Sequence, residues 1–276
     1  IYDVNTMIKY CETKKNAVVI GGGLLGLEAA YGLKQRGMNV TVLHLMDRIM
    51  ERQLDGRASR MLRHSIEEKG IKIITEANTE ALIGKNGHVS QIRLKDGTLL
   101  DADLVVFAVG IRPNITLAQS AGLRCNRGIL VNDTMQTFDP SIYAVGECIE
   151  HRNQTFGLVE PLWGQAFICA THLAEHGSLT FKSPTVPTQL KVSGVDVFSA
   201  GNFEPKEDYE DIILNDEKRH IYKRIIIQKD KVIGAVLFGD TEDGMWYAEL
   251  IADQTPVSTF RNKLLFGKDF ALKKAG

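Results

Sequence analysis

The fold is decided by one stretch near the start of the chain, Ala17-Val18-Val19-Ile20-Gly21-Gly22-Gly23-Leu24-Leu25-Gly26-Leu27-Glu28-Ala29-Ala30. It opens with an apolar run that is typical of a buried strand and breaks at three glycines. Apolar residues then recur at 27, 30 and 33, which is the spacing of one helix face. Gly37 ends that helix behind basic residues, and the apolar run 40–43 supplies a second strand. The stretch predicts a βαβ unit.

The turn of this unit carries the pattern G-x-G-x-x-G at Gly21, Gly23 and Gly26. Within a βαβ unit the pattern is typical of dinucleotide binding. The first glycine permits the tight turn, the second lets the pyrophosphate approach the backbone, and the third lets helix and strand pack closely. Free N–H groups and a partial positive charge at the helix start favour the anion. We expect the nucleotide to lie across Gly23, Leu24 and Leu25.

The choice between NAD and NADP stays open at the end of the second strand. An acid there would accept hydrogen bonds from the adenosine ribose of NAD, but this chain has His44. Asp47 follows three residues later, and Arg48 could neutralise a 2′-phosphate. An ordinary solvated loop is an equally good interpretation of His44 and Arg48.

Further along, the pattern alternates between helix and strand. A helix is expected over residues 56–69, a short strand over 71–75, and a strand buried on both faces over 104–109. Between them, Asn86-Gly87 and Asp96-Gly97 join three short runs into an antiparallel meander. The expected class is α/β, with a Rossmann-type domain that includes this meander.

The second half of the chain predicts different elements. We expect short strands over 129–131, 134–137 and 142–145, a helix over 162–176, and a linker marked by Pro184 and Pro187. A small α+β domain follows, with these expected strands and helix: 189–192, 195–200, 222–228, 231–238 and 241–253.

The composition excludes several classes of protein. With 33 basic and 34 acidic residues scattered along 276 positions, no basic stripe predicts nucleic acid and no polybasic arm predicts a membrane surface. No apolar run approaches the roughly 20 residues of a membrane-spanning helix. The four cysteines are too dispersed for a metal or redox pair, so we expect reduced thiols, no metal site and a cytoplasmic protein.

Three motifs in order support a family resemblance. The glycine turn, the run Ala108-Val109-Gly110-Ile111-Arg112-Pro113-Asn114 and the run Ile142-Tyr143-Ala144-Val145-Gly146-Glu147 together resemble the flavoproteins with two dinucleotide-binding domains, which include rubredoxin reductases, ferredoxin reductases and pyridine nucleotide-disulfide oxidoreductases. More narrowly, residues 50–55, 146–148, 157–165 and 190–197 resemble the FAD and NAD(P)H region of assimilatory nitrite reductase large subunits and of the nitrate reductase electron-transfer subunit.

The resemblance implies flavin contacts. Gly146 and Glu147 would meet the ribityl chain of FAD, and Pro161, Leu162 and Trp163 would open a helix that faces the isoalloxazine ring. A dipole at that helix start can stabilise negative charge on reduced flavin. Core packing is at least an equal interpretation of Trp163.

The resemblance also implies how the reaction proceeds. Glu28, Gly110 and Ile111 would lie near the nicotinamide side, although Glu28 can also be an ordinary surface acid of a helix. Hydride would pass from NAD(P)H to FAD and electrons onward to an iron-sulfur or sirohaem acceptor. No catalytic acid or nucleophile is required, because the cofactors perform the chemistry.

The resemblance divides the chain into four segments. Residues 1–12 would end a first FAD-domain segment, 13–112 would form the inserted NAD(P) domain, 113–184 a second FAD-domain segment, and 185–276 a C-terminal reductase domain. Only one glycine motif is present, so we expect half of the FAD site and a missing first FAD motif. A rubredoxin, ferredoxin or disulfide reductase and a non-catalytic NAD(H) sensor remain the alternatives.

Overall fold

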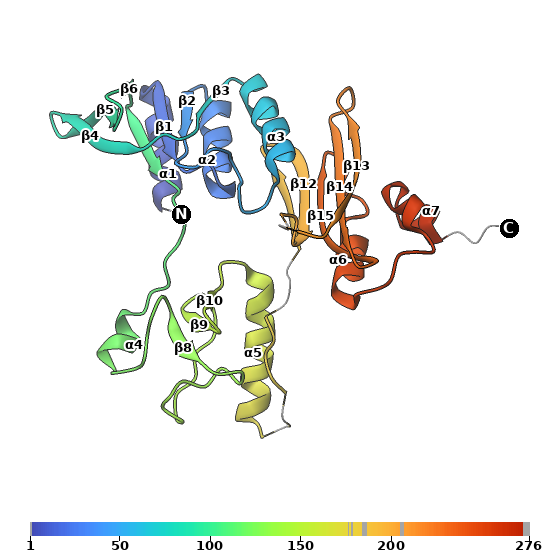
Figure 1. The fold of residues 1–276 in the computed structure, drawn as a ribbon. Coiled ribbons are helices and arrows are strands. Elements are labelled where there is room, and N and C mark those ends of the chain that lie inside the picture. The colour runs from blue at the N-terminus through green and yellow to red at the C-terminus, as the bar shows by residue number, and fades with distance from the viewer. Residues whose placement is uncertain (1, 176, 178, 184–186, 205–206, 273–276) are drawn as a thin grey trace. The chain divides into compact units, whose positions relative to one another are not determined.

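The structure is a computed structural model that describes residues 2–175, 177, 179–183, 187–204 and 207–272. The chain divides into two compact units, the first made of residues 1–109 and 187–276 and the second of residues 110–186. Figure 1 shows the ribbon of both units, with most helices and strands labelled. No helix within the described ranges is long and apolar enough to cross a membrane. The linker expected at Pro184 lies outside the described residues.

A four-stranded parallel sheet forms the centre of the first part of the first unit, in the order β3-β2-β1-β7. Val19 pairs with Val42 on one side and with Val106 on the other, so the strand before the glycine turn is central. Leu27, from the helix after the turn, is fully buried in the same core. The strands are β1 (Asn16–Ile20), β2 (Asn39–Leu43), β3 (Ile71–Ile74) and β7 (Leu104–Phe107), and the helices are α1 (Tyr2–Thr13), α2 (Leu24–Gln35) and α3 (Gly56–Glu68). The predicted α/β unit is confirmed.

Helix α1 has a specific neighbour in this unit. Met7 and Cys11 pack against the core that contains α2, and the thiol of Cys11 lies 3.5 Å from the sulfur of Met38. Residues 1–12, which the sequence assigned to a FAD-domain segment, therefore lie against the nucleotide domain in this structure.

The antiparallel meander forms as a three-stranded sheet in the order β4-β5-β6. Its first turn places Asn86 and Gly87 at φ values of 54° and 79°, the left-handed region that tight hairpin turns require. Ile92 and Leu94 are buried together with Val18 and Leu43 of the parallel sheet. The strands are β4 (Thr79–Lys85), β5 (His88–Leu94) and β6 (Leu99–Asp101).

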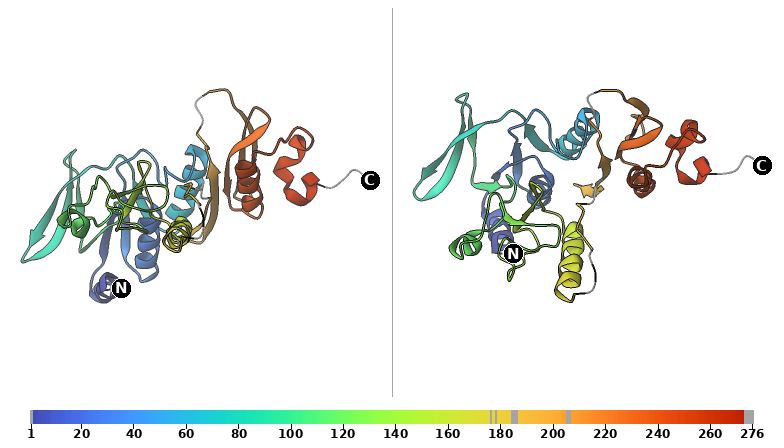
Figure 2. Two further views of the ribbon diagram at one scale, coloured as in Figure 1. Left: turned by 90° about the horizontal axis from the view of Figure 1, so that it is seen from below. Right: turned by 60° about the horizontal axis from the view of Figure 1, so that its bottom comes forward.

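A five-stranded antiparallel sheet completes the first unit, in the order β11-β12-β15-β14-β13. Successive side chains of a strand point to opposite faces. Val197 and Val236 accordingly join the core of the nucleotide domain, whereas Phe198 and Leu237 pack with Trp246 of the following helix. Figures 1 and 2 show this sheet beside α3. Its elements are β11 (Thr188–Val192), β12 (Val195–Gly201), β13 (Glu210–Asp216), β14 (Ile221–Gln228), β15 (Lys231–Phe238), α6 (Gly244–Asp253), the 3-10 helix η1 (Arg261–Phe266) and α7 (Lys268–Leu272).

The second unit is built around a small three-stranded sheet and one long helix. The sheet has the order β10-β9-β8, and Ile149 of β9 is fully buried beside Met135 and Ile168. Its elements are α4 (Thr116–Ser120), β8 (Ile129–Val131), β9 (Ile149–His151), β10 (Gln154–Thr155) and α5 (Val159–Leu173).

Two expectations for the second unit are wrong in detail. Residues 134–137 and 142–145 form one isolated bridge, Gln136 to Tyr143, and no strands. Asn132 accepts hydrogen bonds from two nearby backbone N–H groups, and Thr137 donates to the carbonyl of Ile142, so side chains compete with strand pairing here. The next strand along the chain is β9, which begins after the expected run, at Ile149.

The long helix also begins earlier than expected. It runs from Val159 to Leu173, with Leu158 extended before it. Pro161 therefore lies inside the first turn, where its missing N–H has no intrahelical partner to lose. His176, the expected end, lies outside the described residues.

Candidate nucleotide and flavin sites

Two glycines of the turn are required by close backbone contacts. A Cβ on Gly21 would meet the carbonyl oxygen of Ala108 at 2.2 Å, and the φ of Gly21 is +123°. A Cβ on Gly26 would meet the carbonyl oxygen of Gly21 at 1.9 Å. Strand β1, strand β7 and helix α2 thus approach each other too closely for any side chain at these two positions.

Gly23 differs because nothing in the protein surrounds it. A Cβ at Gly23 would meet no atom within 4 Å, so this glycine is not needed for packing. It is the N-cap of α2, and within the described chain no side chain caps that helix. The N–H groups of the first turn lack intrahelical partners, and the Leu25 side chain beside them is 70% exposed. The geometry fits an anionic group lying against Gly23, Leu24 and Leu25.

His44 supports the glycine turn from the end of β2. Its Nδ1 accepts a hydrogen bond from the backbone N–H of Gly22 at 3.0 Å, and its Nε2 lies 3.0 Å from Oε2 of Glu51. Because Nδ1 accepts, Nε2 carries the proton and donates to Glu51. The His44 side chain is only 11% exposed, so the solvated-loop interpretation is wrong for this residue.

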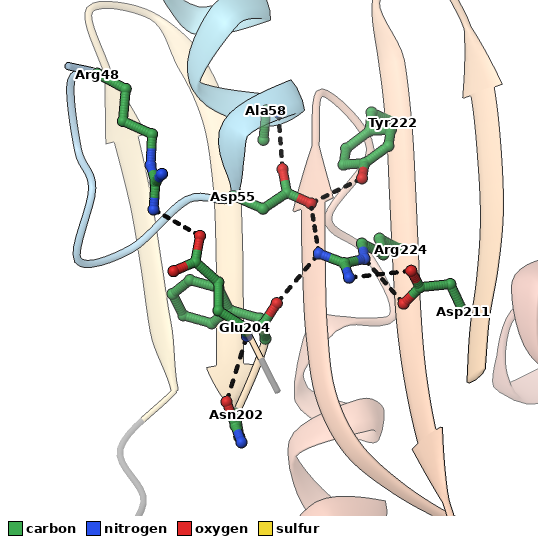
Figure 3. Close-up of polar contacts among 9 residues, drawn as sticks. Arg48, Asp55, Ala58, Asn202, Glu204, Asp211, Tyr222 and Arg224 are labelled. Atoms are coloured by element: carbon green, nitrogen blue, oxygen red, sulfur yellow. Dashed lines mark hydrogen bonds and ion pairs between the residues drawn. The ribbon is translucent and has the colours of Figure 1, made fainter. Parts of the chain in front are cut away.

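Arg48 is paired with an acid from the C-terminal sheet domain. Its Nη2 lies 2.5 Å from Oε1 of Glu204, as Figure 3 shows, and the two side chains are 27% and 49% exposed. Asp47 is exposed beside it. The partner of Arg48 lies 156 residues away in the sequence, and no local pattern could have identified it.

A buried polar network lies next to this pair. Asp55 caps α3 by accepting from the N–H of Ala58 at 2.9 Å, and its other oxygen accepts from Tyr222 at 2.8 Å and Arg224 at 3.3 Å. Arg224 also makes two 3.0 Å contacts with Asp211 (Figure 3). An Asp that precedes a helix is a capping signal in sequence, but the contacts across to β14 are not.

Glu28 is held by the hairpin between β11 and β12. Its Oε1 accepts a hydrogen bond from the backbone N–H of Ser193 at 2.6 Å, and Ser193 is itself fully buried. Glu28 is thus more than an unpartnered surface acid, and the hairpin fixes its position on the second turn of α2.

In the second unit, Gly146 and Glu147 form a turn before β9. Gly146 has a φ of +103°, and its N–H donates to Oε1 of Gln165 at 2.8 Å. Gln165 is fully buried on α5, so the helix fixes the turn that presents the exposed Glu147. The sequence analysis did not identify Gln165 as a site residue. Its polar side chain on the otherwise apolar face of the expected helix is the pattern that could have indicated this role.

The start of α5 lies in the same unit. Pro161 is buried and Leu162 packs against the core, whereas Trp163 is 73% exposed, so the core-packing interpretation of Trp163 is wrong. Glu160 places a negative charge in the first turn. This charge opposes the effect of the helix dipole on any anion bound there.

Gly110 and Ile111 open the second unit. Gly110 has a φ of +95° and is exposed, and Ile111 is 59% exposed. A Cβ on Gly157, just before α5, would lie 3.1 Å from the Ile111 side chain. Ile111 is therefore placed near the loop that leads into α5.

A matching family model identifies the chain. The model described as pyridine nucleotide-disulphide oxidoreductase matches residues 1–166. The chain belongs to this family. A second model, the rubredoxin NAD+ reductase C-terminal domain, matches residues 187–255. The family binds FAD and NAD(P)H.

Curated relatives point to one branch of the family. The chain is 48% identical over 258 residues to the NAD(P)H nitrite reductase of Bacillus subtilis (strain 168), covering 94% of this chain and 32% of that protein. It is 40% identical over 265 residues to the assimilatory nitrate reductase electron transfer subunit of the same organism, covering 96% of this chain and 34% of that protein. The chain therefore spans about a third of the length of these relatives.

Solved structures support the α/β flavoprotein reductase fold, with its parallel sheet and antiparallel C-terminal sheet. The NAD-dependent persulfide reductase from A. fulgidus is similar to this chain with a TM-score of 0.82 and 28% identity. The match covers 95% of this chain and 52% of that one.

The cysteines of this family member are all free thiols. Burial raises the pKa of both the Cys148 and the Cys169 thiol, which disfavours the thiolate that redox exchange needs. Cys169 is buried, and Cys148 is partly buried beside the same core. Both thiols act as small apolar side chains in the second unit.

Proposed function

We propose that this chain is the NAD(P)H-binding and part of the FAD-binding region of an oxidoreductase of nitrite or nitrate reduction. The observation that carries the proposal is the glycine turn, in which Gly21 and Gly26 are sterically required and Gly23 is open at the start of α2. Such a turn fits a pyrophosphate. The names of the two B. subtilis relatives support the choice of nitrite or nitrate reduction.

The proposal assigns a role to each segment. Residues 13–112 bind the nucleotide, residues 1–12 and 113–184 belong to the FAD domain, and residues 185–276 form the C-terminal reductase domain. Gly146 and Glu147 contact the flavin ribityl chain, and the first turn of α5 with Trp163 faces the ring. When bound, FAD supplies a hydride acceptor that releases electrons one at a time.

The residues of the chain position the cofactors. The first turn of α2 holds the pyrophosphate. His44, oriented by Glu51, stabilises the glycine turn through its hydrogen bond with Gly22. Ser193 binds Glu28 and so positions it near the nicotinamide. The electron acceptor is an iron-sulfur or sirohaem domain or subunit. The four free thiols agree with a cytoplasmic site of action.

The test is nucleotide binding followed by electron transfer. The purified protein is titrated calorimetrically with NADH and NADPH, then supplied with FAD and mixed anaerobically with NADH while flavin absorbance is recorded. We expect saturable binding of the nucleotide, but weak or no retention of FAD and little bleaching, because only half of the FAD site is expected in this chain. A protein that binds neither nucleotide would overturn the proposal.

A further inference from the structure

The ion pair between Arg48 and Glu204 joins the loop after β2 to the loop after β12. Glu204 follows Asn202, whose Oδ1 accepts the Glu204 N–H at 3.3 Å, so the acid is held by its own loop (Figure 3). Within the described residues, Nε of Arg48 is buried without a hydrogen-bond partner. The Arg48 guanidinium therefore has donor capacity beyond its contact with Glu204.

We propose that Glu204, contributed by the C-terminal domain, is a specificity-determining residue of the nucleotide site that disfavours NADPH by occupying Arg48. This inference rests on the proposed nucleotide binding. In a Rossmann unit, an arginine near the end of the second strand can accommodate the 2′-phosphate that distinguishes NADP from NAD. Arg48 is such an arginine, four residues beyond the His44 position.

The loop that carries Arg48 is hydrogen-bonded to the glycine turn at two points. His44 accepts a hydrogen bond from the N–H of Gly22, and Met50 donates its own N–H to the carbonyl of Gly22 at 3.0 Å. Arg48 lies between these two anchored residues. The loop on both sides of Arg48 is thus anchored to Gly22 of the turn that would carry the nucleotide.

The charges explain the direction of the effect. A phosphate at the 2′ position adds negative charge that an unpaired Arg48 would attract. Glu204 already neutralises that arginine and would repel the phosphate. NADH carries no 2′-phosphate, and the imidazole of His44 is hydrogen-bonded to Gly22 and Glu51. The Arg48–Glu204 ion pair should therefore change the affinity for NADH little.

The experiment measures the dissociation constants of NADH and NADPH for the wild-type protein and for Glu204→Gln. Glutamine keeps the size of the side chain and removes its charge. We expect NADPH affinity to rise about ten-fold, equivalent to about 1.4 kcal/mol, with NADH affinity nearly unchanged. The gain should vanish in the double variant Arg48→Gln with Glu204→Gln, and it should shrink at high salt.

A matched control tests whether the loss of any ion pair between the two domains changes the preference between NADH and NADPH. Glu217 pairs with Arg57 of the nucleotide domain at 3.0 Å, so it also joins the two domains through an exposed ion pair. Glu217→Gln should leave the ratio of the two affinities unchanged. If Glu204→Gln also leaves that ratio unchanged while the wild type binds NADH, the inference fails and the proposed function stands. If the wild type binds neither nucleotide, the proposed function itself fails.

Discussion

Tyr222 of β14 donates a hydrogen bond to Asp55, the residue that caps α3, at 2.8 Å. The two residues are 167 positions apart in the chain and both are almost fully buried. Burial and the negative charge of Asp55 raise the pKa of Tyr222, so its hydroxyl keeps its proton and remains a donor. This contact ties the C-terminal sheet to the helix that follows the nucleotide-site loop.

Removing that hydroxyl should destabilise the protein. Tyr222→Phe keeps the ring but leaves Asp55 with one donor fewer in a buried site, and we expect a loss of about 1–2 kcal/mol in the free energy of unfolding. Urea denaturation followed by circular dichroism measures it. Tyr2 is 90% exposed, so Tyr2→Phe is the control and should leave the free energy of unfolding unchanged. Equal stabilities of Tyr222→Phe and the wild type would contradict the assigned role.

Substitution of Gly23 should abolish nucleotide binding without unfolding the protein. The space around Gly23 is free, so a valine fits the fold but projects into the region where the pyrophosphate would lie. Calorimetric titration with NADH measures the loss, and circular dichroism checks the fold. Unchanged affinity in Gly23→Val would show that the glycine turn is only structural.

Two other glycines serve as comparisons for that variant. Gly32 lies inside α2 with no atom within 4 Å of an added Cβ. Gly32→Ala should retain nucleotide binding and gain up to about 1 kcal/mol of stability from helix propensity. Gly26→Ala should distort or unfold the domain, because its Cβ would meet the carbonyl oxygen of Gly21 at 1.9 Å.

The second unit should lose stability in acid through Asp133. Hydrogen bonds from Arg152 and His151 lower the pKa of Asp133 from 3.8 to about 2. A group whose pKa is lower in the folded state contributes stability above its unfolded pKa and loses it as the pH falls through the folded value. The contribution of Asp133 is therefore complete above about pH 4 and is lost as the pH falls through about 2.

The variant Asp133→Asn tests this pH dependence. Because the Asp133 carboxylate is partly exposed, we expect it to cost on the order of 1 kcal/mol at pH 7. Urea unfolding at several pH values should show the difference from wild type shrinking between pH 4 and pH 2. A difference that stays constant over this range would contradict the ionic role of Asp133.

Glu150 should be the more costly acid to replace in the same unit. Its buried carboxylate accepts from Asn126 Nδ2 at 3.1 Å and from the backbone N–H groups of Arg127 at 2.8 Å and Gly128 at 3.1 Å. Burial opposes ionisation, but the hydrogen bonds from Asn126, Gly128 and Arg127 outweigh it and lower the Glu150 pKa.

Glu150→Ala leaves these donors unpaired in the interior, and we expect a loss of roughly 2–4 kcal/mol of stability. Hydrogen exchange of peptides from residues 110–175 should show faster opening, because these residues share one small core. Glu147, which is exposed three residues earlier, provides the control variant Glu147→Ala. Similar exchange in both variants would count against the structural role of Glu150.

The local sequence predicted those parts of the fold that depend on neighbouring residues. The turn from β1 to α2 follows from Gly21 and Gly26, which lie five positions apart, and the meander follows from Asn86-Gly87, where two residues adopt positive φ. The error at residues 142–145 has the opposite origin. That run is apolar enough for a strand, but it makes one isolated bridge, between Gln136 and Tyr143, and the Thr137 hydroxyl also donates to the carbonyl of Ile142.

Tertiary structure alone decided how the site is supported and how its charge is balanced. The sequence supplies Arg48 and an open choice between NAD and NADP. Only the fold brings Glu204, 156 residues away, to within 2.5 Å of it. Alternation along β14 sets the face on which Tyr222 lies, but only the fold brings Asp55 to that face. Propensity and turn chemistry act over a few residues, whereas these ion pairs and buried hydrogen bonds form only after two separately predicted domains share a core.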